Sequence, residues 1–201
     1  GDKQSGEIHE IGFQLYTEML NRAVKSLRSG KEPDLLSPMQ ATTDVNLGCP
    51  ALLPNDYCPD VHERLSLYKR FASCEDFDTL GQLREELIDR FGNLPDPARA
   101  FYETHRLRLE MVMLGIKKMD ASINGVQMQF ISKPPLDPVK FIQLVQSNPQ
   151  IQLNGQDRLK FIPNKGSTFD KLEQRIEAIR QLMKLLSGAV LANVAASPVP
   201  A

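Results

Sequence analysis

The sequence has no tryptophan and only three cysteines among its 201 residues. Cys49, Cys58 and Cys74 are an odd number at wide spacings, and none belongs to a C-x-x-C pair. This excludes a zinc-ligand set and a disulfide framework, so we expect isolated thiols in a reducing, cytoplasmic environment. No apolar run approaches the roughly 20 residues that cross a bilayer, and we therefore expect no membrane association through a spanning helix.

Motifs that bind nucleotides or carry out hydrolysis are also missing. The sequence contains neither G-x-x-x-x-G-K-[ST] nor G-x-G-x-x-G, and it contains no G-x-S-x-G or H-E-x-x-H. The nearest nucleophilic pair is Cys58 with His62, but a lone histidine near a helix start is more often a surface residue. Carboxylates such as Glu85, Glu86 and Glu110 fit ordinary solvated helix faces. We therefore predict that this chain has no catalytic, cofactor or metal site and is not itself an enzyme.

The overall composition is that of a folded domain without a bias towards nucleic acid. Hydrophobic residues make up 41% and charged residues 24%, and the formal net charge is -1. Local basic residues, namely Lys69, Arg70, Arg106 and Arg108, leave a DNA-binding module as an alternative. Acidic residues lie between them and aromatic content is only 6%, so solvated helix faces are the favoured interpretation.

The beginning of the chain reads as a helix followed by a linker. Residues 8–29 have helical apolar spacing, and Gly30 follows them as a stop signal. Residues 31–43 contain two prolines and no periodicity, which indicates a domain boundary. The chain opens at Gly1 without methionine, and we interpret this as the start of a fragment.

The next part is predicted to be mainly helical. Alternation at residues 44–47 indicates a short strand, and helices are expected from Asp60, over 77–91 and from Asp96 to about residue 114. Asp60 and Glu63 have capping-box spacing, and Asp96 before Pro97 is expected to cap the third helix. The predicted buried stripe of the helix from Asp60 is Val61, Leu65, Tyr68 and Ala72, with Phe71 alongside.

The last part looks like one unit written twice. Asn124-Gly125 and Asn154-Gly155 each predict a type I′ hairpin, and each is followed by a helix, over 136–147 and 168–187. Ser167 is expected to cap the second of these helices. Two strand–strand–helix units predict a small antiparallel sheet with helices on one face, and therefore an α+β fold.

These elements divide the chain into three predicted parts. Residues 1–41 are a helix and linker, residues 42–187 are the main domain, and residues 188–201 are a flexible tail rich in Ala, Val, Ser and Pro.

One surface is a candidate for binding a partner. On the predicted helix 77–91, Glu86, Asp89 and Arg90 fall within one arc opposite or flanking the apolar residues. Glu86 and Arg90 have the favourable i,i+4 order, worth roughly 0.2–0.5 kcal/mol. The simplest interpretation is a self-paired surface salt bridge, and the alternative is a mixed-charge docking face.

Several motifs, in order and correctly spaced over about residues 1–187, resemble the bacterial transcription-repair coupling factor family. Those of the end of its motor are Gln4-Ser-Gly6, Ile11-Gly-Phe13 and Leu15-Tyr16. Those of its C-terminal domain are Pro59-Asp60, Arg64-Leu65, Leu67-Tyr-Lys-Arg70, Glu86-Leu-Ile-Asp-Arg-Phe-Gly92, Leu94-Pro95 and Leu159-Lys-Phe161.

The resemblance implies a regulatory role inside a larger protein. The parent would be an ATP-dependent and Mg²⁺-dependent translocase on double-stranded DNA that displaces stalled RNA polymerase and recruits nucleotide-excision repair. Residues 1–41, including Gln4, Ser5 and Gly6, would be a remnant of its motor domain. The C-terminal domain would dock on the UvrB-like N-terminal module, mask its UvrA-binding surface and so act as an autoinhibitory clamp. Glu86, Asp89 and Arg90 would form part of that contact, while a DNA-binding accessory module of a helicase remains the alternative.

Overall fold

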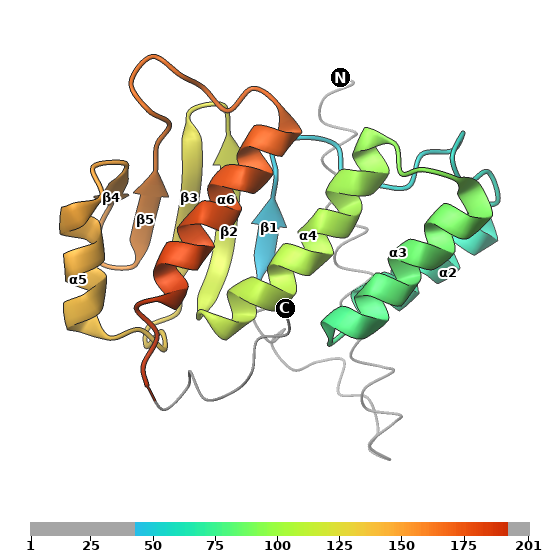
Figure 1. Ribbon diagram of the computed structural model, residues 1–201. Helices are drawn as coiled ribbons and strands as arrows, with labels where there is room; N and C mark the ends of the chain where they lie inside the picture. Colours follow the sequence, from blue (N-terminus) through green and yellow to red (C-terminus); the bar gives the residue numbers. More distant parts are fainter. Residues whose placement is uncertain (1–42, 193–201) are drawn as a thin grey trace. The chain divides into compact units, whose positions relative to one another are not determined.

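The computed structural model describes residues 43–192, which form five helices and a five-stranded sheet (Figure 1). The predicted α+β fold class is confirmed. The described chain divides into two compact units. We call Leu53–Asn93 the helical hairpin, and we call the described residues of 41–52 and 94–201 the sheet unit. The predicted helix over 8–29 and the linker lie outside the described residues, apart from Thr43 at the linker's end.

The helical hairpin consists of α2 (Val61–Ala72) and α3 (Phe77–Phe91). The Asp60 half of the predicted capping box is confirmed, because the Asp60 carboxylate accepts a hydrogen bond from the Glu63 backbone N–H at 2.8 Å, while the Glu63 side chain pairs with Arg90 instead. A second cap starts α3, where the Asp76 carboxylate accepts from the backbone N–H of Thr79 at 2.7 Å. The buried residues of the two helices are Leu67, Phe71, Ala72, Leu80, Leu83 and Leu87.

The predicted buried stripe of α2 is wrong at two positions. Val61 is 54% exposed and Leu65 is 44% exposed. The helix instead buries Leu67 together with Phe71, which was predicted to lie beside the stripe, and these two residues are also four apart. Both sets satisfy helical periodicity, so spacing alone does not decide which one faces the interior. The larger side chain of Phe71 loses more apolar surface to solvent when it is the buried one.

The sheet unit contains the remaining elements. They are β1 (Asp44–Asn46), α4 (Asp96–Met113), β2 (Ile116–Ser122), β3 (Gly125–Phe130), α5 (Pro138–Ser147), β4 (Ile151–Leu153), β5 (Arg158–Phe161) and α6 (Leu172–Ser187). The strand order is β1-β2-β3-β5-β4. The two predicted strand–strand–helix units are present, and their four strands pair antiparallel as expected. The sheet is nevertheless mixed, because β1 adds a fifth strand parallel to β2.

The two predicted turns connect the expected strands but have a different geometry. Among the described residues no side-chain-bearing residue has a positive φ, whereas a type I′ turn requires positive φ at both central positions. In each Asn-Gly pair only the glycine has a positive φ, which is 144° at Gly125 and 86° at Gly155. At Gly125 a Cβ would lie 2.6 Å from the carbonyl oxygen of Phe161, so this turn approaches β5 too closely for any other residue.

The helices cover one face of the sheet, with α4 over β1 and β2, α6 over β3, and α5 beside β4 (Figure 1). Met119, Met128 and Leu159 are register partners on neighbouring strands, and each is fully buried on the helix-covered side. The other side, which we call the open face, carries only polar side chains. They are Asp44, Asn46, Lys118, Asp120, Gln127, Gln129, Gln152, Arg158 and Lys160.

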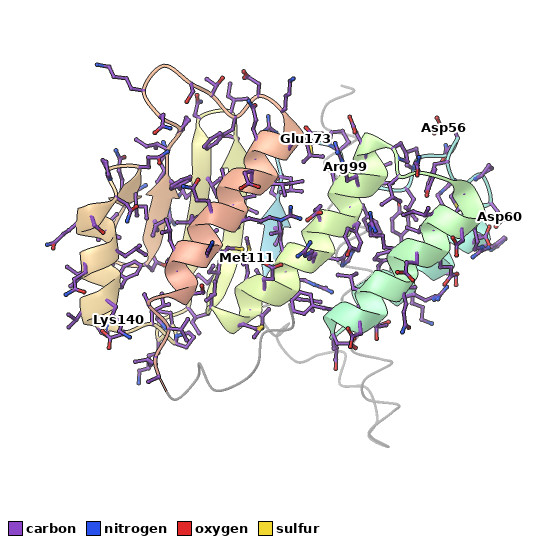
Figure 2. The ribbon with its side chains drawn as sticks, viewed as in Figure 1. Asp56, Asp60, Arg99, Met111, Lys140 and Glu173 are labelled. Carbon is purple, nitrogen blue, oxygen red and sulfur yellow. The ribbon has the colours of Figure 1, made fainter. Side chains whose placement is uncertain are left out.

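Ion pairs join α4 to α6. Arg99 of α4 pairs with Glu173 at the start of α6, and both are labelled in Figure 2. Further along the same two helices, the Arg180 guanidinium of α6 donates to both carboxylate oxygens of Glu103 of α4 at 3.0 Å. These contacts fix α4 and α6 side by side above the sheet.

Two predicted helix starts are displaced. α4 has Pro95 rather than Asp96 as its N-cap, and α6 begins at Leu172 with Lys171 rather than Ser167 as its cap. The segment before α6 is held out of the helix by other bonds. The backbone N–H of Phe169 donates to the carbonyl of Ile123 at 2.9 Å, so this stretch is tied to the β2–β3 turn.

The residues directly after α6 also pack on the sheet unit. Ala189 is 2% exposed, and its carbonyl accepts from the backbone N–H of Asp137 at 2.7 Å. The backbone N–H of Leu191 donates to the carbonyl of Pro135 at 3.0 Å. The packed segment therefore extends past residue 187, where we expected the tail to begin.

Candidate functional site on helix α3

Helix α3 presents the three predicted interface residues because its apolar residues are spaced for one buried face. Leu80, Leu83 and Leu87 are 0–4% exposed, and the residues between them point outward. Glu86 is half-buried beside this face, while Asp89 and Arg90 are exposed. The structure thus brings all three onto one solvent-accessible side of the helical hairpin.

Glu86 is the centre of an ion-pair network. Its carboxylate receives two hydrogen bonds from the Arg70 guanidinium, at 2.7 and 2.5 Å, which is the bidentate arrangement. It also receives one from Arg90 at 3.1 Å, which confirms the predicted i,i+4 pair. Arg90 in turn pairs with Glu63 of α2. We call these four residues, Glu63, Arg70, Glu86 and Arg90, the charge network.

The charge network links α2 to α3 and fixes the direction of its side chains. The hydrogen bonds from Arg70 are the main reason that the pKa of Glu86 lies below its usual range. The Arg90 guanidinium also lies 5.0 Å from the centre of the Phe91 ring, in a cation–π contact. The side chains are 30–46% exposed, so the network is a surface feature that a partner can reach.

Asp89 differs from its two neighbours. It is exposed, and its carboxylate makes no hydrogen bond or ion pair with any residue between 43 and 192. The charge network beside it is neutral, with two carboxylates and two guanidinium groups. Of the three predicted residues, Asp89 alone therefore adds an unbalanced negative charge beside the network, and the exposed Glu85 lies one turn before it on the same helix.

Sequence reasoning missed two members of the network, since it considered Arg70 as a DNA contact and as part of a family motif, and Glu63 as a capping residue. Their spacing contains a usable signal. Glu63 and Arg70 are seven residues apart and so lie on the same side of α2, two turns from each other. On α3 the acidic residue Glu86 likewise precedes the basic residue Arg90. When two such helices lie side by side, the acidic residue of each can pair with the basic residue of the other, as Glu63 does with Arg90 and Glu86 with Arg70.

The alternative hydrolytic pair is not supported. Cys58 is fully buried, and this burial raises the pKa of its thiol, so the reactive thiolate is disfavoured. His62 is exposed in the first turn of α2. Within residues 43–192 no group of three or more His, Cys, Asp and Glu side chains is arranged to hold a metal ion.

The basic residues considered for DNA binding are partly engaged inside the protein. Arg70 belongs to the charge network, and Arg106 pairs with Glu110 at 3.3 Å on α4. Lys69 is exposed in the last turn of α2. A phosphate would have to displace these carboxylates, which lowers the electrostatic gain of a DNA contact.

Gln4, Ser5 and Gly6, the predicted motor remnant, lie outside the described residues. No helix in the described part of the chain has the length and apolar character needed to cross a membrane.

Comparison with known proteins gives consistent matches. The family model of the TRCF domain matches residues 47–141. The Transcription-repair-coupling factor of Escherichia coli (strain K12) is 42% identical over 193 residues, which is 96% of this chain and 16% of that protein. The Transcription-repair-coupling factor of Haemophilus influenzae is 41% identical over 183 residues, covering 90% of this chain and again 16% of the relative. The chain therefore spans about one sixth of the length of these curated relatives.

A solved structure has the same fold. It is described as the crystal structure of the C-terminal domain of transcription-repair coupling factor, and it aligns with a TM-score of 0.57. The alignment covers 73% of this chain and 95% of the other, at 20% sequence identity. At that identity the likeness concerns the fold alone.

Proposed function

This chain belongs to the transcription-repair-coupling factor family, and we propose that it is the autoinhibitory docking domain of a full-length member acting in DNA repair. The docking partner is the UvrB-like module at the N-terminus of the same protein. Docking masks the surface of that module which binds UvrA. Release of the domain exposes the surface and permits recruitment of the repair machinery.

The observation that carries this proposal is the fixed mixed-charge face of α3. The charge network holds Glu86 and Arg90 in place through α2, so the face is ordered before a partner arrives. An ordered face costs less conformational entropy on docking than one with free side chains. Asp89 then supplies an open carboxylate for a cationic group on the partner.

A face of this kind suits a switch. Interfaces between domains of one chain are moderately sized and rather polar, so their closed state is stable by only a few kcal/mol. A competing partner then opens the protein if its differential affinity matches that value. An apolar interface of the same area would be harder to release, and in the open state it would expose an apolar patch that favours aggregation.

We place the motor functions outside this chain. ATP hydrolysis, Mg²⁺ binding, movement on double-stranded DNA and displacement of RNA polymerase belong, in this proposal, to other parts of the parent protein. The chain contributes regulation of these activities rather than their chemistry.

The test is UvrA binding by the full-length protein with Asp89→Ala. Loss of the open carboxylate weakens docking, so we expect UvrA affinity to rise by about fivefold or more, the usual size of such a coupling. Glu177→Ala is the matched control, since Glu177 is an exposed carboxylate on α6 of the sheet unit. Binding is measured by titration of labelled UvrA at fixed salt.

Two outcomes decide the proposal. An increase for Asp89→Ala together with no change for Glu177→Ala supports a docking contact at α3. Unchanged UvrA affinity in Asp89→Ala, or an equal increase in both variants, contradicts it.

A further inference from the structure

The open face of the sheet is a second surface that the proposed function does not use. Every side chain that the register places on it is polar, from Asp44 on β1 to Gln152 on β4. The helices α4, α5 and α6 all lie on the opposite side (Figure 1). This surface belongs to the sheet unit and contains none of the residues of the charge network.

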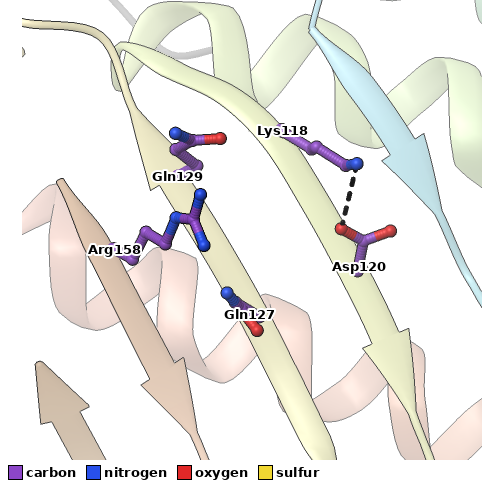
Figure 3. A pocket seen from close by; sticks show the side chains of 5 residues that line it. All are labelled: Lys118, Asp120, Gln127, Gln129 and Arg158. Carbon is purple, nitrogen blue, oxygen red and sulfur yellow. Dashed lines mark ion pairs between the residues drawn. The ribbon is translucent and has the colours of Figure 1, made fainter. Parts of the chain in front are cut away.

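A hollow lies in the middle of this face, over β2, β3 and β5. It is lined by Lys118, Asp120, Gln127, Gln129 and Arg158. Figure 3 shows the Arg158 guanidinium lying across β3 between the two glutamine side chains. The lining residues come from neighbouring register rows, since Lys118, Gln129 and Arg158 are successive partners across the three strands.

Some polar groups around the hollow already have partners. The Gln129 amide donates to the Asp157 carboxylate at 2.7 Å, and this bond is the first cause of the lowered pKa of Asp157. Lys117 lies 3.8 Å from the same carboxylate, and Lys118 lies 3.7 Å from Asp120. The carboxylates of Asp120 and Asp157 are therefore already paired with side chains of this chain.

The donors that remain are concentrated on Arg158. Its Nε lies 3.9 Å from Asp157, but its two terminal nitrogens make no hydrogen bond to any residue of the described part of the chain. The side-chain amide of Gln127 is likewise without a hydrogen bond to residues 43–192. Lys118 adds an ammonium group that is 48% exposed, with only a long contact to Asp120. A planar guanidinium fork, an amide and an ammonium group therefore face one hollow.

From this geometry we propose that the hollow binds the carboxylate of an acidic segment in a partner protein. The guanidinium fork of Arg158 matches a carboxylate through two parallel hydrogen bonds. Lys118 and Arg158 give the lining two positive charges against the single negative charge of Asp120. The whole sheet unit has the same sign, with fourteen basic and ten acidic residues in its described part, so it attracts an acidic segment over a longer range.

A nucleic acid fits the same face less well. Base stacking needs exposed aromatic rings, and the open face has none among its residues. Asp44 and Asp120 also lie on the face and oppose a continuous run of phosphates. An isolated carboxylate avoids both problems, because it occupies only the hollow.

The experiment is a titration of the isotope-labelled chain with a capped hexaglutamate peptide, followed by amide chemical shifts. We expect shifts on β2, β3 and β5 around Lys118, Gln127 and Arg158, and no shifts in the helical hairpin. A capped hexaglutamine peptide should leave the spectrum unchanged. Arg158→Glu should weaken hexaglutamate binding by about tenfold, whereas Arg158→Lys, which keeps the charge but loses the fork, should weaken it less.

The control is Lys140→Glu, which reverses the charge of an exposed lysine on α5 (Figure 2). It carries the same change of net charge, so it should alter the affinity by less than about twofold. Lys118→Gln gives an independent test of the hollow if Arg158→Glu disturbs the core resonances. Equal losses for Arg158→Glu and Lys140→Glu, or tighter binding of a duplex DNA than of hexaglutamate at these residues, would overturn the proposal. A failure here leaves the docking face of α3 untouched, because that face is tested by UvrA binding.

Discussion

The helical hairpin and the sheet unit differ in charge and in how their polar groups are used. The helical hairpin has nine acidic and five basic residues, and the sheet unit has fourteen basic and ten acidic ones in its described part. The helical hairpin keeps its ion-pair network on the surface, at 30–46% exposure. The sheet unit instead buries a cation, Arg175, which is only 8% exposed.

This difference indicates that the charged groups of one unit support folding and those of the other support docking. The buried cation of the sheet unit joins segments far apart in the chain, so its loss should affect folding. The surface network of the helical hairpin shapes a face for a partner, so its loss should affect docking more than folding. Four substitutions test this division, from the largest expected effect on stability to the smallest.

Arg175→Ala should lower the free energy of unfolding of the sheet unit by about 3 kcal/mol. The Arg175 guanidinium donates to the carbonyls of Leu47 and Gly48 at 2.9 Å and to that of Phe169 at 2.8 Å. Its removal leaves these acceptors without their donor. Urea unfolding measures the change, and Lys184→Ala on the exposed side of α6 is the control. A loss no larger than the control's would show that the buried cation is dispensable.

Gly48→Ala should cost about 2 kcal/mol, because Gly48 has a φ of 67° and its Cβ would lie 2.5 Å from the carbonyl oxygen of Ala121. Gly81→Ala on α3 is the matched control in the helical hairpin. A Cβ there meets nothing within 4 Å, so alanine should raise stability by up to about 1 kcal/mol. Opposite signs in thermal unfolding are expected, and destabilisation by both would contradict the comparison.

Glu86→Ala should destabilise the helical hairpin by about 1 kcal/mol, a small value because the carboxylate is partly exposed and screened by salt. The pKa of Glu86 is lowered in the folded state, chiefly by Arg70. Its contribution is therefore complete above the unfolded pKa and is lost as pH falls through the lower folded pKa. Amide exchange of α3 measured across acidic pH should show this loss in the native chain and not in Glu86→Gln. An identical pH profile in both proteins would show that the Glu86 carboxylate does not contribute to the stability of the helical hairpin.

Asp89→Asn should change stability by less than about 0.5 kcal/mol, since this carboxylate has no partner in the described chain. The same helix thus offers a paired and an open carboxylate three residues apart. Chemical denaturation of Glu86→Gln and Asp89→Asn compares them directly. A loss in Asp89→Asn as large as that in Glu86→Gln would mean that Asp89 supports the fold rather than a partner.

Much of this structure could be predicted locally. The apolar spacing of Leu80, Leu83 and Leu87 predicts α3, and it also predicts the side on which Glu86, Asp89 and Arg90 lie. The Asp60 cap is confirmed for the same reason, since donor and acceptor are three residues apart. Such features depend on contacts within one or two turns, which the sequence order itself supplies.

Other features could not be predicted because they depend on partners distant in sequence. The partner of Glu86 is Arg70, sixteen residues earlier on another helix. The parallel pairing of β1 with β2 joins residues 74 positions apart, as Asp44 with Lys118 shows. The exposure of Val61 and Leu65 likewise depends on which side of α2 meets the rest of the helical hairpin.

The sequence by itself determined the helices, the two hairpins β2–β3 and β4–β5, the α+β class and the charged arc of α3, because each follows from short-range periodicity and turns. The tertiary structure alone decided that Glu86 and Arg90 are held by Arg70 and Glu63 while Asp89 stays open. It also decided that Arg158, Gln127 and Lys118 meet over one hollow. Both arrangements need strands or helices from different parts of the chain to lie together, and local preferences do not specify that register.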